Sequence, residues 1–326
     1  MRFVRYVLTA AAALAPCGET SCSPPAREQP SEGTFLATSV LLPALGADRI
    51  SSAARAPNGD VILGVVGYSN GGSIVRVLKR KRVVAFRTTD PVAAVGMSDA
   101  GGICWVPYVR PVVTCKRDDG QEHTYPIPMS RPAPQLLRVG PKLFAVDVVH
   151  GRVFTVGRSR VAYFASFTPG ASVTSGPADV IALTTTERCS VRAGARLSKC
   201  VLLRPPLRGA AAVAAAGDAV FVSDYPAHAL TVIGPDGTTG IHNLPLAPYG
   251  ISIRNDSSAW IGLSDSGGHL ALYAASQREL RRYELPSKLK GYLYADAILL
   301  PHAIGDDLAV VDNHQRLVTF LTLPTR

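Results

Sequence analysis

At four places in this 326-residue sequence, an aspartate that ends a β-forming run is followed by a histidine two to four residues later. The four pairs are Asp147 with His150, Asp224 with His228, Asp265 with His269, and Asp312 with His314. Imidazole and carboxylate groups bind divalent metals, and histidine can act as a general base near neutral pH. If the four pairs surround one opening, they predict a site for a divalent metal or an anionic ligand.

A structural role is the alternative, and we favour it. Each aspartate stands where a β-forming run ends, and aspartate closes such turns by accepting hydrogen bonds from backbone N–H groups two residues on. Histidine is an ordinary exposed turn residue, and the variable spacing within the pairs does not require the imidazoles to converge. The sequence identifies no catalytic residue: its one Gly-x-Ser-x-Gly stretch, at 67–71, is not followed by a helical pattern, and it contains no glycine-rich phosphate loop followed by a helix.

The elements that carry these pairs recur about every 40 residues, a period typical of propeller blades. The clearest copy is 218–245, in which three β-forming runs are separated by Ser-Asp-Tyr-Pro and Gly-Pro-Asp-Gly turns. Residues 211–216, almost all alanine, predict a small inner strand just before it. One four-stranded sheet cannot bury both of its apolar faces, so several must pack around an axis. The sequence therefore predicts an all-β fold, a β-propeller.

Six copies of the repeat are clear, and the segment 169–206 is ambiguous. It is either an elaboration of the third blade or a degenerate seventh blade. We predict six four-stranded blades, with seven as the alternative. Residues 35–43 end in Leu-Pro, as other outer strands do, and the last blade lacks an outer strand. We therefore expect the N-terminal strand to complete that blade and close the ring, so that 34–326 is one propeller domain.

The beginning of the chain predicts export. Arg2 and Arg5 precede a short apolar run, the arrangement of a signal peptide, and the run is too short to span a bilayer. A membrane anchor is the alternative. We predict an export signal at 1–22 and a polar, proline-rich tether at 23–33. Cys17 stands where a bacterial lipoprotein would be lipidated, although Pro16 departs from that pattern.

Four of the six cysteines lie within the predicted propeller, in two pairs that are each eleven residues apart. An even cysteine count in an exported chain favours disulfides. We predict the bonds Cys104–Cys115 and Cys189–Cys200. Zinc binding is the alternative, but no Cys-x-x-Cys spacing supports it.

The formal net charge is +10, which favours anionic partners. For an exported protein these would be anionic envelope components, and nucleic acid is not expected. The densest basic run, residues 79–82, falls at a predicted hairpin tip, so a solvated turn is its simplest interpretation. A membrane contact is expected only through the lipid anchor.

Two stretches, FVSDYPAHALTVIGPDG and LAVVDNHQRLVTFLTLP, resemble the NHL-type repeat, in which an aliphatic strand ends in aspartate and a polar turn follows. The same style of repeat occurs in the streptogramin lyase-like and gluconolactonase-like propellers. The resemblance implies a β-propeller over most of 33–326. In those enzymes a divalent metal or catalytic histidine and glutamate groups occupy the central channel, but their catalytic residues cannot be matched here position by position.

Two functions follow as expectations. The first is an exported, non-catalytic binding scaffold of the bacterial envelope, periplasmic, outer-membrane-anchored or secreted, that recognises a protein, glycan or other ligand on one face and needs no cofactor. The second is a metal-dependent lyase or hydrolase that uses the Asp/His turns and the channel.

Overall fold

The computed structural model of this protein describes residues 35–42, 49–67, 71–78, 83–98, 101–129, 135–157, 160–176, 178–192, 199–208, 212–255, 258–301 and 307–323. The predicted export signal, Cys17, the tether and the basic run at 79–82 lie outside these residues. Within them, no helix is long and apolar enough to cross a lipid bilayer.

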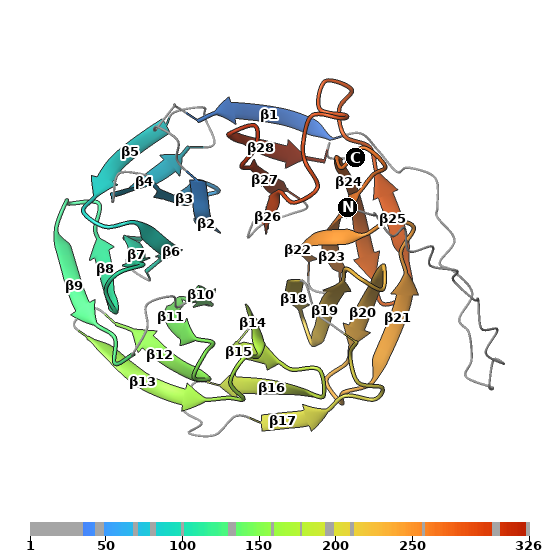
Figure 1. Cartoon of the computed structure of the whole chain (residues 1–326), viewed down its shortest axis with the longest axis horizontal. Coiled ribbons are helices and arrows are strands. Elements are labelled where there is room, and N and C mark those ends of the chain that lie inside the picture. The colour runs from blue at the N-terminus through green and yellow to red at the C-terminus, as the bar shows by residue number, and fades with distance from the viewer. Residues whose placement is uncertain are drawn as a thin grey trace, which may run out of the picture.

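The described chain forms seven antiparallel sheets of four strands each, arranged as blades around a central axis (Figure 1). Blade 1 contains β2 (Arg49–Arg55), β3 (Val61–Val66), β4 (Gly72–Val77) and β5 (Val83–Thr88). Blade 2 contains β6 (Val92–Met97), β7 (Ile103–Pro107), β8 (Val112–Lys116) and β9 (Glu122–Pro126). Blade 3 contains β10 (Gln135–Val139), β11 (Lys142–Asp147), β12 (Arg152–Val156) and β13 (Val161–Ser166).

Blade 4 contains β14 (Ser172–Ser175), β15 (Asp179–Leu183), β16 (Glu187–Arg192) and β17 (Lys199–Leu202). Blade 5 contains β18 (Ala212–Ala216), β19 (Ala219–Asp224), β20 (Ala229–Ile233) and β21 (Thr239–Asn243). Blade 6 contains β22 (Pro248–Asn255), β23 (Ser258–Ser264), β24 (Leu270–Ser276) and β25 (Leu280–Tyr283). Blade 7 contains β26 (Ile298–Pro301), β27 (Leu308–Asp312), β28 (Leu317–Thr322) and the N-terminal strand β1 (Leu36–Leu41).

The prediction of six blades is wrong, because the ambiguous segment forms a blade of its own, β14 to β17. Its repeat is hard to recognise because its first and last strands have only four residues each. It also lacks the aspartate that usually ends the second strand. Instead, the hydroxyl of Thr184 accepts hydrogen bonds from the backbone N–H groups of Thr186 and Glu187, so a threonine closes this turn.

Burial between the sheets explains why the ring forms. The described residues contain seven clusters of buried apolar side chains, and each cluster draws its members from two successive blades. Phe221 of blade 5 packs with Ile261 of blade 6, for example. The second strands are buried almost throughout. Each sheet therefore depends on its two neighbours for the burial of its apolar faces, as the repeat predicts.

The N-terminal strand lies beside the C-terminal one. β1 pairs antiparallel with β28 from Leu36 opposite Thr322 to Leu41 opposite Leu317, and Figure 1 shows the two strands next to each other at the outer rim. Just before β1, the ring of Phe35 packs 5.5 Å from the ring of Trp260 in blade 6. Blade 7 thus combines strands from both ends of the described chain.

Both predicted cysteine pairs lie at bonding distance, with Sγ–Sγ separations of 2.09 Å for Cys104–Cys115 and 2.10 Å for Cys189–Cys200. In each case the two cysteines are directly opposite each other on neighbouring antiparallel strands. The bonds therefore join the second and third strands of blade 2 and the third and fourth strands of blade 4.

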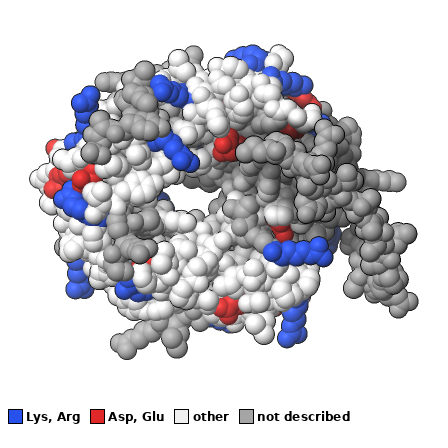
Figure 2. Space-filling view, viewed as in Figure 1, with Lys and Arg blue, Asp and Glu red and all other residues white. Residues whose placement is uncertain are grey.

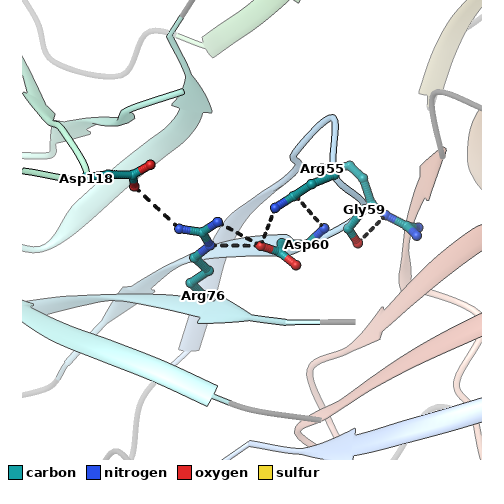
Figure 3. Close-up of polar contacts among 6 residues, drawn as sticks. Arg55, Gly59, Asp60, Arg76 and Asp118 are labelled. Atoms are coloured by element: carbon teal, nitrogen blue, oxygen red, sulfur yellow. Dashed lines mark hydrogen bonds and ion pairs between the residues drawn. The ribbon is translucent and has the colours of Figure 1, made fainter. Parts of the chain in front are cut away.

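A polar bridge links blades 1 and 2 (Figure 3). The buried carboxylate of Asp60, between β2 and β3, forms an ion pair with Arg76 of β4 at 2.9 Å. Arg76 also lies 3.6 Å from the exposed carboxylate of Asp118, in the turn between β8 and β9. The ion pair with Arg76 offsets the free-energy cost of burying the charge of Asp60.

Antiparallel order gives the ring two distinct faces. Turns between second and third strands lie on the same face as the loops that join successive blades, and we call this the upper face. Turns between first and second strands, and between third and fourth strands, lie on the lower face. All four Asp/His pairs belong to second-to-third-strand turns, in blades 3, 5, 6 and 7, so the upper face carries them.

Candidate functional site

On the upper face, Tyr294 lies between the histidines of two neighbouring blades. Its ring centroid is 5.6 Å from that of His269, in the turn between β23 and β24, and 4.7 Å from that of His314, in the turn between β27 and β28. Tyr294 itself belongs to the long connection from β25 to β26. The fold therefore brings two of the four predicted histidines together, through a tyrosine.

The connection that carries Tyr294 is held by its apolar side chains and its backbone. Leu289 and Leu293 are buried in the core between blades 6 and 7. The backbone N–H of Leu270 donates to the carbonyl of Leu293 at 2.8 Å, and that of Ala295 donates to Gly268 at 3.0 Å. Burial alternates along this stretch: Leu293 and Ala295 are buried, whereas Tyr292, Tyr294 and Asp296 are more exposed to solvent.

Two aspartates complete this part of the site. Asp312, fully buried, accepts a hydrogen bond from the backbone N–H of Tyr294 at 2.8 Å and another from Gln315 at 2.9 Å. The exposed carboxylate of Asp296 lies 3.1 Å from Nε2 of His314. Asp312 therefore positions the tyrosine, whereas Asp296 contacts the histidine at the surface.

A second aromatic pair lies on blades 5 and 6. Tyr225 follows β19 and Tyr249 lies in β22, and their ring centroids are 4.9 Å apart. The hydroxyl of Tyr249 donates to that of Tyr225 at 3.1 Å. This hydrogen bond raises the pKa of Tyr249, and partial burial and the negative charges of Tyr225 and Asp296 raise it further. A Cβ atom on Gly250, next to Tyr249, would lie only 3.3 Å from the carbonyl oxygen of Ala297, next to Asp296, so the tyrosine pair and the Tyr294 group adjoin each other.

We call this combined surface the upper-face patch. Its members are Tyr225, Tyr249, His269, Tyr294, Asp296 and His314. Tyr225 is 43% exposed and Tyr249 37%, and the side chains of Asp296 and His314 are more than half exposed. Such a surface offers aromatic area together with hydrogen-bonding groups.

The remaining predicted site residues mainly close their own turns. Asp147 accepts hydrogen bonds from the backbone N–H of His150 at 3.1 Å and from Arg152 at 2.8 Å, and Nδ1 of His150 is 2.9 Å from the same carboxylate. Burial acts to raise the pKa of Asp147, but the hydrogen bonds from Arg152 and His150 outweigh burial and hold it below the ordinary value. Blade 4 separates this turn from the upper-face patch.

Asp224 and Asp265 behave in the same way. Asp224 accepts from the backbone N–H of Ala227 at 3.1 Å, and His228 adopts a positive φ of 46° at the end of that turn. Asp265 accepts from Gly267 and His269, both at 2.8 Å. The turn-closing role favoured from the sequence therefore describes all four aspartates, while His269 and His314 also enter the patch.

One group of three metal-ligating side chains has its donor atoms within 4.8 Å of one another in the described parts of the chain. It consists of Glu187, Cys189 and Cys200, and its two sulfur atoms are joined to each other. The Asp/His pairs do not form such a group at the distances shown. Binding of a metal by them would need side-chain rotation.

Sequence reasoning missed Tyr225, Tyr249, Tyr294 and Asp296. A sequence signal for this part of the site was the stretch Tyr-Leu-Tyr-Ala-Asp at 292–296. Apolar and polar residues alternate there, within a connection that otherwise has no regular pattern. Its proximity to His269 and His314 depends on the packing of blade 6 against blade 7. No local pattern could have revealed that proximity.

Comparisons with known proteins support the fold. The chain is similar to virginiamycin B lyase from Staphylococcus aureus, with a TM-score of 0.67 and 12% identity over 89% of this chain and 100% of that one. It is also similar to YCF48 bound to D1 peptide, with a TM-score of 0.63 and 11% identity over 92% of this chain and 100% of that one.

A third similar structure is that of BBS1N in complex with ARL6DN, with a TM-score of 0.64 and 11% identity over 90% of this chain and 97% of that one. No family model matches the sequence, and no curated protein sequence matches it. At these identities the similarity concerns the fold and not the activity. The chain thus has a streptogramin lyase-like β-propeller fold.

Proposed function

We propose that this protein is a non-catalytic binding propeller of the bacterial envelope, and that it holds a protein ligand against its upper-face patch. The observation that carries the proposal is the grouping of Tyr225, Tyr249 and Tyr294 with two histidines on one exposed surface. Tyrosine is enriched at protein interfaces because it supplies a large rigid contact area and a hydrogen-bonding hydroxyl at little entropic cost.

Contacts within the chain hold the patch in place. Asp312 accepts a hydrogen bond from the backbone at Tyr294, and the hydroxyl groups of Tyr249 and Tyr225 are hydrogen-bonded to each other. A preorganised surface loses less conformational freedom on binding. Propellers of similar fold include one bound to a peptide and one in complex with another protein, which supports a protein ligand as the first choice.

Affinity capture with matched variants tests this proposal. The purified protein carrying a photo-crosslinker would be incubated with an envelope fraction, and each captured protein would then be produced and titrated calorimetrically. We expect Tyr249→Ala to weaken binding of the ligand at least about tenfold, the usual size for an interface anchor. Tyr163→Ala is the control, because Tyr163 is 57% exposed on the outer strand β13. Equal affinity of the two variants would refute a role for the patch.

A metal-dependent lyase or hydrolase is the second candidate, and a specific arrangement favours it. His269 and His314 flank Tyr294, and a carboxylate, that of Asp296, contacts His314. One of the similar structures is a catalytically inactive variant of virginiamycin B lyase in which alanine replaces a histidine. Metal analysis of the purified protein, followed by assays of His269→Ala and His314→Ala, distinguishes the candidates. A metal-free protein whose ligand affinity is unchanged in both variants would exclude the enzyme.

Export and lipidation belong to the same proposal. The two disulfides are typical of an oxidising compartment, and the basic and apolar start of the chain supports secretion. The mass of the N-terminal peptide from mature protein tests both ideas. Attached acyl chains on Cys17 would indicate an anchored lipoprotein, whereas a free N-terminus near residue 23 would indicate a periplasmic or secreted protein, and an uncleaved Met1 would exclude export by this signal.

A further inference from the structure

The axis of the ring encloses a cavity of about 890 Å³, and Figure 2 shows the central opening. The first strands of all seven blades contribute to its lining. Most of the lining side chains are small or apolar, and Leu136, Val173, Val213, Ile251 and Leu299 are examples. The volume is in the range of cavities that bind small molecules.

Three arginines interrupt this apolar lining, and no aspartate or glutamate is among the lining residues that the structure describes. Arg55, Arg138 and Arg254 stand at or next to the final residues of β2, β10 and β22. First strands end at the lower face, so Arg55 and Arg138, from blades 1 and 3, stand at the lower mouth of the cavity.

Arg55 and Arg138 are held by contacts that leave hydrogen-bonding capacity. Nε of Arg55 donates to the carbonyl of Gly59 at 3.0 Å and its Nη1 to that of Leu300 at 3.3 Å. Nε of Arg138 donates to the carbonyl of Gly140 at 3.0 Å. Within the described parts of the chain, neither Arg55 nor Arg138 has a carboxylate within ion-pair distance. Arg254 differs, because its guanidinium lies over the rings of Trp260 and Tyr283, 4.9 and 5.2 Å from their centroids, and is directed toward the outer strand β25.

The charge of Arg55 is only partly balanced. Burial lowers the pKa of Arg55 to about 10, although the more distant carboxylates of Asp307 and Asp60 act in the opposite direction. Figure 3 shows Arg55 extended toward Gly59, while the Asp60 carboxylate faces Arg76. A half-buried guanidinium with no carboxylate at ion-pair distance favours an anion, because the low local polarity strengthens the attraction.

We propose that the cavity binds a small amphipathic anion, with a carboxylate or phosphate head at Arg55 and Arg138 and an apolar body along the first strands. Guanidinium groups suit both heads because they donate two parallel hydrogen bonds to neighbouring oxygens. The small and aliphatic lining offers the body a desolvated surface. This site lies at the opposite mouth from the upper-face patch, so it is independent of the function proposed there.

Calorimetric titration with octanoate, octyl phosphate and octanol tests the proposal. These probes share one apolar body and differ in the head. We expect either anion to bind at least about tenfold more tightly than octanol, since hydrogen bonds to charged groups commonly contribute that much. The tighter of the two anions identifies the preferred head. Failure of both anions to bind, or equal affinity for octanol, would overturn the proposal.

Variants locate the binding. Arg138→Gln removes a half-buried charge from the cavity, and we expect about a tenfold loss of affinity for the better anion. Arg160→Gln is the matched control, because Arg160 is an exposed arginine of the same blade, beside β13 and away from the cavity lining. Arg55→Gln provides a second test if Arg138→Gln fails to fold, as judged by circular dichroism. An affinity that is unchanged in the folded cavity variants would contradict this site.

Discussion

The carboxylate of Asp312 accepts a hydrogen bond from the backbone N–H of Tyr294, 18 residues earlier in the chain, at 2.8 Å. Asp312 ends the second strand of blade 7, and Tyr294 lies in the connection that enters the same blade. This hydrogen bond therefore positions the partly exposed ring of Tyr294 through a buried residue of the turn. The same aspartate that closes a repeat turn also shapes the candidate site.

Loss of the Asp312 carboxylate should destabilise the protein and disorder the patch. Asp312→Ala leaves two buried N–H groups, those of Tyr294 and Gln315, without their acceptor. We expect a loss of about 1–3 kcal/mol in the free energy of unfolding, measured by urea denaturation. Asp312→Asn retains one acceptor oxygen and should lose less. Equal losses for the two variants would show that the hydrogen bonds are not the cause.

The bridge between blades 1 and 2 offers a contrast between a buried and an exposed partner. Arg76→Ala removes the ion pair to the Asp60 side chain, which is only 8% exposed, and we expect a loss of about 2–3 kcal/mol in stability. Asp118→Ala removes a partner that is 79% exposed, and the change should stay within about 0.5 kcal/mol. Guanidinium unfolding is unsuitable because its salt screens the pairs, so urea is used. Similar losses in both variants would contradict this explanation.

Each disulfide should contribute measurably to stability. Cys104 and Cys115, like Cys189 and Cys200, close a loop with a sequence separation of 11 residues. A loop of this size is worth about 2–3 kcal/mol through restriction of the unfolded chain. Replacing Cys189 and Cys200 together by serine should therefore lower the urea midpoint. Mass spectrometry of non-reduced peptides checks the pairing, and any other connectivity would refute it.

Acid should weaken the turn of blade 3 through Asp147. The pKa of this carboxyl is lower in the folded protein than its ordinary value of 3.8, so its ionised form favours folding. The contribution is fully present above the unfolded pKa and is lost as the pH falls through the folded pKa. Below about pH 4, Asp147→Asn should therefore lose less stability per pH unit than the parent protein. Parallel stability profiles for the two proteins would argue against this linkage.

The N-terminal strand should hold the two ends of the ring together. Deletion of residues 1–42 removes β1, its pairing with β28 and the contact of Phe35 with Trp260. We expect a large loss of cooperativity and stability, because blade 7 then has an unpaired edge and the cores on both sides lose apolar area. Deletion of residues 1–34 retains β1 and serves as the control. Identical unfolding of the two truncated proteins would show that β1 does not close the ring.

Local patterns in the sequence determined much of the scaffold. Runs such as Ala219–Asp224 alternate with turn residues at a regular period, and that period is sufficient to predict strands, turns and a propeller. The alanine-rich inner strand and both disulfides also followed from residue type and spacing. These features depend on contacts between neighbours in the chain, which is why the sequence alone could indicate them.

The number of blades and the surfaces required the tertiary structure. Blade 4 could not be recognised in the sequence because its first strand is short and Thr184, not an aspartate, closes its turn. Its apolar faces nevertheless pack against both neighbouring blades, as those of the other blades do. The meeting of Tyr294 with His269 and His314, and the placement of Arg55 and Arg138 at one mouth of the cavity, join residues that are far apart in the chain. Such proximity is set by how the sheets pack around the axis, and no local pattern encodes it.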